Sequence, residues 1–102
     1  MDLCTEVYRI TEQFPRREMF GLTRQMRDAA NSVPSNIAEG EGRRTRGERR
    51  QFLGQARGSL YELETQLLVA RRVGYAPPEE IFKVVKQTKA ALEGYIRHVE
   101  KN

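Results

Sequence analysis

Apolar residues recur every three or four positions along nearly the whole chain, which is the spacing of helices that bury one face. Strand signals, such as alternating apolar runs on both sides of a tight turn, are nearly absent. The first apolar stripe ends before Pro15, because a residue that precedes proline is pushed out of helical geometry. This stripe predicts a helix over residues 2–14, and its members are Leu3, Val7, Ile10 and Phe14.

A second stripe predicts a helix over residues 21–39, with an apolar face made of Leu22, Met26, Ala29, Ala30, Val33 and Ile37. Pro34 lies within it, and an internal proline removes one backbone hydrogen bond and normally kinks a helix. We expect Pro34 to interrupt the helix unless neighbouring side chains bond the freed carbonyl groups; the candidates are Ser32, Ser35 and Asn36. Gly40 and Gly42 mark the end, since glycine accepts a left-handed cap without strain.

The longest predicted helix covers residues 45–74, and Thr45 with Glu48 three positions later is a capping-box pattern. Its inward face consists of Phe52, Ala56, Leu60, Leu63, Leu67 and Ala70. A fourth helix is predicted over residues 78–101, with an apolar face of Ile81, Val84, Val85, Thr88, Leu92, Tyr95, Ile96 and Val99. Four amphipathic helices with short loops predict an all-α fold, an antiparallel up-and-down four-helix bundle that forms one domain over residues 1–102.

The composition excludes several function classes. Hydrophobic residues make up 38% and charged residues 31% of the chain, too apolar a balance for disorder and too polar for a membrane protein. No membrane-spanning or secretory segment is visible, so we expect a cytoplasmic location. The single cysteine, Cys4, and the single histidine, His98, cannot supply a zinc-ligand set or a nucleophile with its base. The sequence therefore predicts no enzyme activity, no metal and no cofactor.

A run of residues through the second and third predicted helices resembles a known family. The likeness is strongest over SVPSNIAEG at residues 32–40, followed by Arg43, Phe52-Leu53, Ala56-Arg57-Gly58-Ser59 and Glu62-Leu63. Further matches are Tyr8-Arg9-Ile10-Thr11, Phe14-Pro15, Glu18 and the stretch from Leu22 to Gln25. These residues, spread over nearly the whole chain, resemble the bacterial four-helix bundle proteins, a family also named after intervening sequences in 23S ribosomal RNA genes.

The resemblance implies a left-handed up-and-down bundle that assembles as a ring-like homopentamer and has no enzyme activity. The family is similar to the accessory proteins of diversity-generating retroelements, which bind a reverse transcriptase and its RNA. It thus implies three partners: further copies of the chain, RNA and a reverse transcriptase. Family members usually carry further residues, an aromatic one included, ahead of the segment that begins at Asp2, and there the chain departs from the family pattern.

The densest charged feature is a group of arginines at the start of the third predicted helix: Arg43, Arg44, Arg46, Arg49 and Arg50. Arg57 extends it, because residues spaced by seven, such as Arg43, Arg50 and Arg57, share a narrow strip of a helix. The net charge of +4 favours acidic partners, and guanidinium groups fork onto phosphates. The strip predicts contact with an RNA or DNA backbone. A solvated face beside Glu41, Glu48 and Glu62, or salt bridges between subunits, are the alternatives.

Two apolar residues of the third helix, Tyr61 and Leu68, fall outside its inward stripe. A second apolar flank is consistent with a broader core or with an interface between protomers. The family resemblance favours the interface. Phe82, off the inward arc of the fourth helix, is a weaker candidate for the same interface.

Four residues of the family motif, Asn36, Glu39, Ser59 and Glu62, are predicted to make buried polar contacts between the second and third helices. We interpret them as structural. The leading functional hypothesis is a homo-oligomeric accessory protein that grips RNA phosphates through the arginine strip. The rival is a protein-interaction scaffold in which the arginines serve subunit contacts or solubility. No polar constellation supports a small-molecule site inside the bundle.

Overall fold

The computed structural model describes residues 2–101, and these residues contain helices and no strand. The elements are α1 (Leu3–Thr11), a short 3-10 helix η1 (Arg16–Glu18), α2 (Leu22–Glu41), α3 (Arg46–Arg72) and α4 (Glu79–Lys101). The prediction of an all-α fold is confirmed. Three of the four predicted helices agree with the observed ones to within about two residues at each end, which is the usual uncertainty of helix termini.

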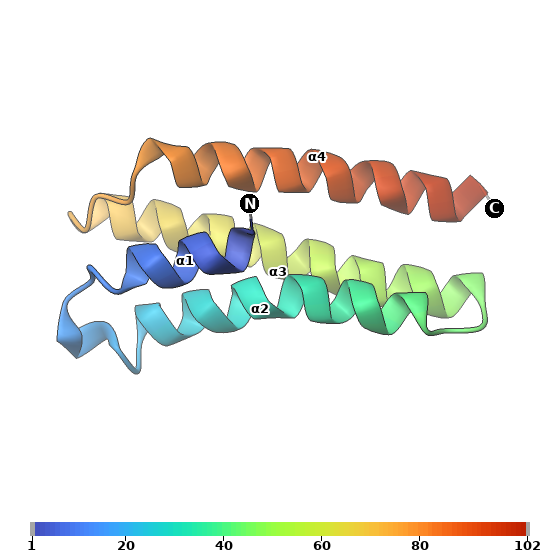
Figure 1. Ribbon diagram of the computed structural model, residues 1–102, viewed down its shortest axis with the longest axis horizontal. Helices are drawn as coiled ribbons and strands as arrows, with labels where there is room; N and C mark the ends of the chain where they lie inside the picture. Colours follow the sequence, from blue (N-terminus) through green and yellow to red (C-terminus); the bar gives the residue numbers. More distant parts are fainter. Residues whose placement is uncertain (1, 102) are drawn as a thin grey trace.

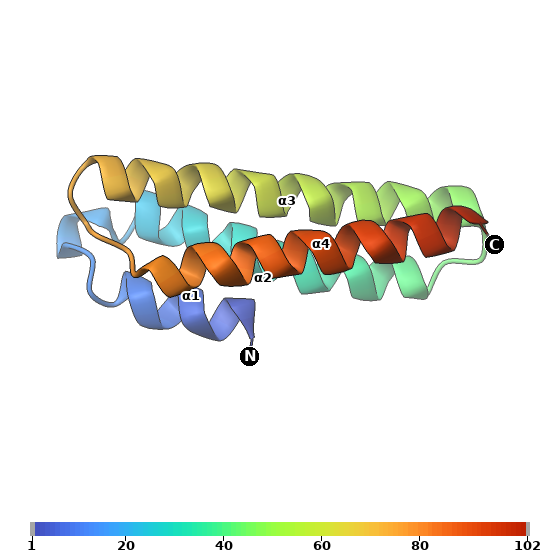
Figure 2. The ribbon, with the colours of Figure 1, turned by 90° about the horizontal axis from the view of Figure 1, so that it is seen from above.

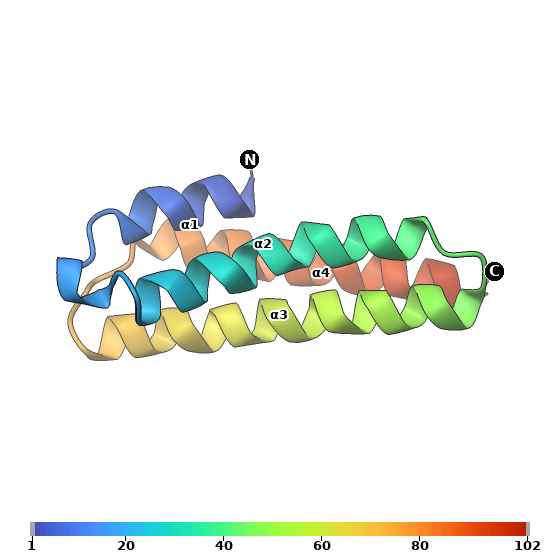
Figure 3. The same ribbon diagram turned by 90° about the horizontal axis from the view of Figure 1, so that it is seen from below.

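The helices form a rod of 45 × 24 × 20 Å (Figure 1). Each helix packs against two others, in the pairs α1–α2, α2–α3, α3–α4 and α1–α4, and the chain direction reverses from each helix to the next (Figures 1 and 2). This is the antiparallel up-and-down arrangement that the sequence predicts. α1 has nine residues and spans about 14 Å at 1.5 Å per residue, so it covers only one end of the α2–α4 side (Figure 3).

The core follows the predicted apolar stripes closely, except that Leu53 takes the buried position in α3 that was predicted for the adjacent Phe52. Leu53 is buried with 2% exposure, whereas Phe52, predicted to point inward, is only half-buried. The rotation of α3 therefore places Leu53 in the core and Phe52 at its edge. The buried apolar residues are Leu3, Val7, Ile10, Phe14, Met26, Ala29, Ala30, Val33, Leu53, Ala56, Leu60, Leu63, Leu67, Ala70, Ile81, Val85, Leu92 and Val99.

The first helix is shorter than predicted, since it ends at Thr11 rather than at residue 14. The N–H groups of Gln13 and Phe14 bond to carbonyls only three residues earlier, at 3.1 Å each, so the chain tightens into a turn ahead of Pro15. Phe14 remains buried outside the helix, with its ring centroid 5.2 Å from that of Tyr75. The apolar stripe thus predicted burial correctly but overestimated the length of the helix.

Pro34 does not interrupt α2, which runs unbroken from Leu22 to Glu41. Proline lacks the N–H that would bond to the carbonyl of Ala30, four residues earlier. The thiol of Cys4 on α1 takes that place, with Sγ 3.2 Å from the Ala30 oxygen. Of the neighbours expected to help, Asn36 bonds instead to the backbone carbonyl of Ser32, at 2.8 Å. The freed carbonyl is therefore satisfied from another helix.

The predicted start of α3 is confirmed by its cap. The N–H of Glu48 donates to Thr45 Oγ1 at 3.1 Å, and the Glu48 carboxylate accepts the Thr45 hydroxyl at 3.0 Å. This cap fixes the direction in which the chain leaves the α2–α3 loop. The arginine-rich segment consequently lies at one end of the rod, opposite η1 (Figure 1).

Candidate nucleic-acid interface

The arginines around the α2–α3 loop differ in what they contact. Arg44, Arg46 and Arg50 are exposed, and none of them forms an ion pair or a side-chain hydrogen bond with another residue in the range 2–101. An exposed guanidinium without a partner keeps all five of its N–H donors available to an external acceptor. These three side chains therefore form the free part of the predicted phosphate-binding group.

The Arg43 side chain forms contacts within the protein. Its Nη2 lies 2.9 Å from Glu39 Oε2, and its guanidinium carbon lies 4.6 Å from the centroid of the Phe52 ring. Its backbone carbonyl accepts Arg49 Nε at 3.3 Å. Because α3 begins only at Arg46, Arg43 does not continue the helical repeat, so its predicted place on one strip with residues 50 and 57 is wrong.

Arg57 joins α3 to α4. Its Nε lies 2.6 Å from Glu93 Oε1, and its guanidinium carbon lies 5.4 Å from the Tyr61 ring centroid. A hydrogen bond with Tyr61 and, next, the charge of Glu93 raise the pKa of Arg57 above its usual value. Arg57 therefore contributes to helix packing, and its charge is partly compensated by the chain itself.

Residues 39–50 still carry more positive than negative charge, with five arginines against Glu39, Glu41 and Glu48. All three carboxylates have partners within the chain. Glu39 pairs with Arg43, Glu48 caps α3, and Glu41 accepts the Tyr95 hydroxyl at 3.3 Å. Burial, followed by the charge of Glu41, raises the pKa of Tyr95. The three carboxylates are thus engaged within the chain, and the free charge at this end is positive.

The predicted interface residues do not form one patch. Tyr61 and Leu68 are 42% and 43% exposed on α3, but Phe82 is half-buried and packs on the core with Arg71 4.5 Å above its ring. Lys89 of α4 was not predicted to contact this surface, yet its Nζ lies 4.6 Å from the Tyr61 ring centroid and 2.9 Å from Glu64 Oε1. Because Lys89 and Tyr61 are far apart in the sequence and lie on different helices, no local pattern predicts this contact.

The family-motif residues divide into two pairs. Asn36 and Ser59 are half-buried and both bond to Ser32 Oγ, at 2.9 and 2.7 Å. The Ser59 bond links α2 to α3 as predicted, whereas the Asn36 bond stays within α2. Glu39 and Glu62 are exposed, and so the prediction that they make buried contacts is wrong. Carboxylates rarely lose their hydration without a compensating charge, and Glu39 instead finds Arg43 at the surface.

Other kinds of site have little support in the described part of the chain. Among residues 2–101, no three histidine, cysteine or acidic side chains gather where they could hold a metal ion. None of the helices described is both long enough and apolar enough to cross a membrane. The surface with a distinct chemical character is the arginine-rich end of the rod.

The fold and this surface define the class: a small antiparallel four-helix bundle with a basic end. The family model described as 23S rRNA-intervening sequence protein matches residues 1–94, and the chain belongs to this family. The family expected from the motif at residues 32–40 is thereby confirmed. Comparison with curated proteins returns no match.

Proposed function

We propose that this chain is a non-enzymatic, homo-oligomeric binding protein that contacts the phosphate backbone of RNA through the α2–α3 end of the bundle. The observation that carries the proposal is the group of three exposed arginines, Arg44, Arg46 and Arg50, without partners in the described chain. The family description refers to an intervening sequence of 23S rRNA, which favours RNA over DNA as the ligand. It names no reaction, in keeping with a binding role.

The mode of binding follows from the chemistry of the guanidinium group. Arginine offers paired N–H donors that match two oxygens of one phosphate, and each phosphate neutralised in this way releases bound counterions. Contacts to phosphate carry no base information, so we expect low sequence specificity. An assembly of several copies would present several such ends to one RNA, and avidity would strengthen a weak single site.

The test is a titration of fluorescently labelled single-stranded RNA at rising salt concentration. The wild-type affinity is expected to fall steeply with salt, because each contacted phosphate contributes about 0.7 to the logarithmic slope for single strands. The triple variant Arg44→Glu, Arg46→Glu, Arg50→Glu should bind RNA weakly and lose about 2 from that slope.

Arg24→Glu is the control for a single charge reversal away from the loop. Arg24 is exposed near the other end of α2 and lies 4.0 Å from Asp28, so its reversal changes the net charge without altering the loop. The control should retain RNA binding. Salt-independent binding, or a triple variant that binds as tightly as the wild type, would remove the proposal.

Self-association is proposed from the exposed apolar side chains of α3. Tyr61 and Leu68 lie on one side of this helix, and the neighbouring Gly54 and Gly58 have open space where a side chain would be. A second copy could approach closely over such a surface. The pentameric state, the cytoplasmic location and the reverse-transcriptase partner stay predictions.

The rival hypothesis, a scaffold for another protein without direct RNA contact, is favoured by the same exposed residues of α3. Leu68 in particular has no intramolecular cover over 43% of its surface. The RNA titration separates the two hypotheses, because a scaffold would show no salt-dependent RNA binding by the chain alone.

A further inference from the structure

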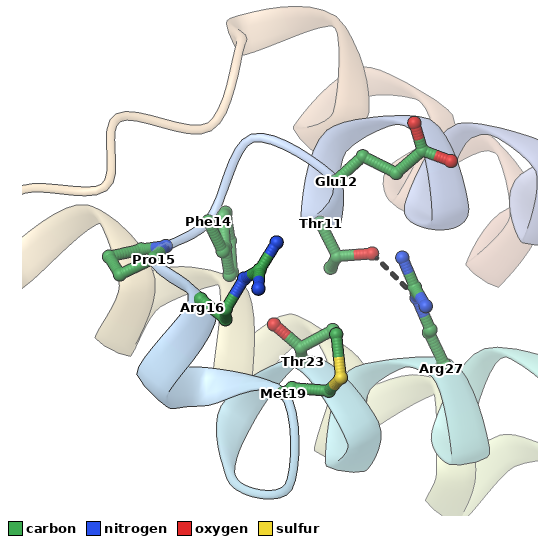
Figure 4. A pocket seen from close by; sticks show the side chains of 8 residues that line it. All are labelled: Thr11, Glu12, Phe14, Pro15, Arg16, Met19, Thr23 and Arg27. Carbon is green, nitrogen blue, oxygen red and sulfur yellow. Dashed lines mark hydrogen bonds between the residues drawn. The ribbon is translucent and has the colours of Figure 1, made fainter.

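A cavity of about 380 Å³ lies at the end of the rod opposite the arginine-rich loop, where α1, η1 and α2 meet (Figures 1 and 4). This volume falls within the range of small-molecule sites, roughly 300–1,000 Å³. One wall is apolar, and the remainder is made of hydroxyl and charged groups. The lining residues are Thr11, Glu12, Phe14, Pro15, Arg16, Met19, Thr23 and Arg27.

The hydroxyl of Thr23 points into this cavity. Thr23 is only 5% exposed, yet its side chain forms no hydrogen bond with any residue in the described range. Figure 4 shows its oxygen directed away from α2, toward the side of the cavity where Arg16 lies. The other buried threonine, Thr11, bonds to the Val7 carbonyl one turn earlier, at 2.7 Å. The Thr23 hydroxyl is therefore available to a polar group that enters the cavity.

Two guanidinium groups line the same cavity, and one of them is held in place. Arg27 Nε donates to Thr11 Oγ1 at 2.8 Å, and its guanidinium carbon lies 4.6 Å above the Tyr8 ring. These contacts fix the side chain but leave Nη1 without an acceptor in residues 2–101. Arg16 is exposed and has no ion pair there. A cation held in place beside an exposed one suits an anion that enters from solvent.

The nearby carboxylates do not neutralise this pair. Glu12 lines the cavity, but Figure 4 shows its carboxylate pointing away from Arg16 and Thr23. Glu18 accepts the Tyr75 hydroxyl at 2.6 Å and the N–H of Leu22 at 3.2 Å. These two hydrogen bonds, in that order, lower the pKa of Glu18 and keep its charge engaged outside the cavity.

We propose that this cavity binds a phosphate monoester, with Arg16 and Arg27 on the charged oxygens and the Thr23 hydroxyl donating to the same group. Phe14, Pro15 and Met19 form the apolar wall, which would cover the organic part of the ligand. Two sources share this chemistry: a free mononucleotide and the 5′-phosphorylated end of an RNA. The inference does not depend on the arginines of the α2–α3 loop, which lie at the other end of the molecule.

The test is calorimetric titration of the full chain with uridine 5′-monophosphate, inorganic phosphate and uridine. Uridine 5′-monophosphate and phosphate should bind, and uridine should not. Thr23→Val keeps the shape of the side chain but removes the hydroxyl, and Arg16→Gln removes one charge; each should weaken binding about tenfold, the usual cost of losing a hydrogen bond to a charged group. Arg24→Gln, an exposed arginine outside the cavity, should bind like the wild type.

Thermal unfolding of each variant shows whether a loss of binding comes from a folding defect. Thr23→Val should melt close to the wild-type temperature, because the hydroxyl that it removes forms no hydrogen bond within the described residues. A 5′-phosphorylated oligoribonucleotide that binds more tightly than its 5′-hydroxyl counterpart assigns the RNA end as the source, and equal binding of the two assigns the mononucleotide. The proposal is overturned if no phosphate compound binds, or if Thr23→Val and Arg16→Gln bind as tightly as the wild type.

Discussion

At the scale of single residues, half-buried polar groups decide how the helices fit together. Cys4 offers its thiol to the carbonyl that Pro34 leaves free, and burial raises the pKa of that thiol, so the donating proton stays in place. Glu18 and Tyr75, far apart in sequence, join η1 to the α3–α4 loop. Each contact replaces hydrogen bonds to water that folding removes. Loss of one partner therefore leaves the other group without a hydrogen bond and lowers the free energy of unfolding.

The pairing of Cys4 with the Ala30 carbonyl predicts an energetic coupling between Cys4 and Pro34. Cys4→Ala should lower the free energy of unfolding by about 1 kcal/mol, because it leaves a buried carbonyl without a donor. In a Pro34→Ala background the restored N–H serves that carbonyl, and so the same change should cost less. Chemical denaturation of the four proteins in this double-mutant cycle measures the coupling. Equal costs in both backgrounds would contradict the prediction.

The pair formed by Glu18 and Tyr75 predicts a pH-dependent contribution to stability. The hydrogen bond lowers the pKa of Glu18 below its usual value of 4.5 and raises that of Tyr75 above 10.0. The stabilisation is therefore complete between these values, lost in acid as pH falls through the lowered pKa, and lost in alkali as pH rises through the raised one. Tyr75→Phe should be less stable than the wild type at neutral pH and equal to it in strong acid. Denaturation across a pH series measures the difference, and a difference that persists in acid would refute it.

At the scale of elements, α3 contains glycines at positions where the packing of the single chain leaves room for a side chain. An added Cβ at Gly47, Gly54 or Gly58 would meet nothing within 4 Å. At Gly40 of α2, by contrast, an added Cβ would lie 3.2 Å from Phe52 Cβ. Glycine weakens a helix by about 1 kcal/mol relative to alanine, so of these four helical glycines Gly40 is the one with a packing reason within the described chain.

The same substitution at two glycines should consequently have opposite effects. Gly54→Ala should raise the free energy of unfolding by about 1 kcal/mol, through helix propensity alone. Gly40→Ala should lower it by about 1 kcal/mol, because the added methyl group would press against Phe52 Cβ and force α2 and α3 slightly apart. Urea denaturation of dilute protein measures both changes. A loss of stability at Gly54 would show that a second chain packs there even in dilute solution.

At the scale of the whole molecule, the rod separates its chemical features. The free arginines lie at the α2–α3 end, the Thr23 cavity lies at the opposite end, and the exposed Tyr61 and Leu68 lie on α3 between them. This separation would allow the chain to associate with further copies through the Tyr61–Leu68 side of α3, while the two ends of the rod remain accessible to other ligands. It also allows each surface to be changed without disturbing the other two.

Leu68→Asp tests the assembly surface. The substitution places a charge on a residue that is 43% exposed, so it should leave the helical content nearly unchanged while lowering the assembled mass. Analytical ultracentrifugation at several concentrations, with circular dichroism, measures both. Val73→Asp is the control, since Val73 is 55% exposed but lies at the end of α3, outside the Tyr61–Leu68 side. An unchanged mass for Leu68→Asp would show that Leu68 does not take part in an interface between copies of the chain.

The sequence by itself determined the helices, nearly all of the core and the family. Spacings of three and four encode which face of a helix is buried, and the cap at Thr45 uses neighbours in sequence, so both are visible without coordinates. The sequence failed where the backbone leaves the helical repeat, as at residues 12–14, and at Phe52 and Leu53, where two adjacent apolar residues compete for one inward position.

Only the tertiary structure decided which polar groups are engaged and which are free. Arg57 pairs with Glu93, Cys4 bonds to Ala30, and the Thr23 hydroxyl has no hydrogen-bond partner among residues 2–101, although no spacing along the chain distinguishes these three outcomes. The physical reason is that contacts between helices depend on the rotation and axial offset of each helix. Packing of the whole core sets these two quantities, and no local pattern specifies them.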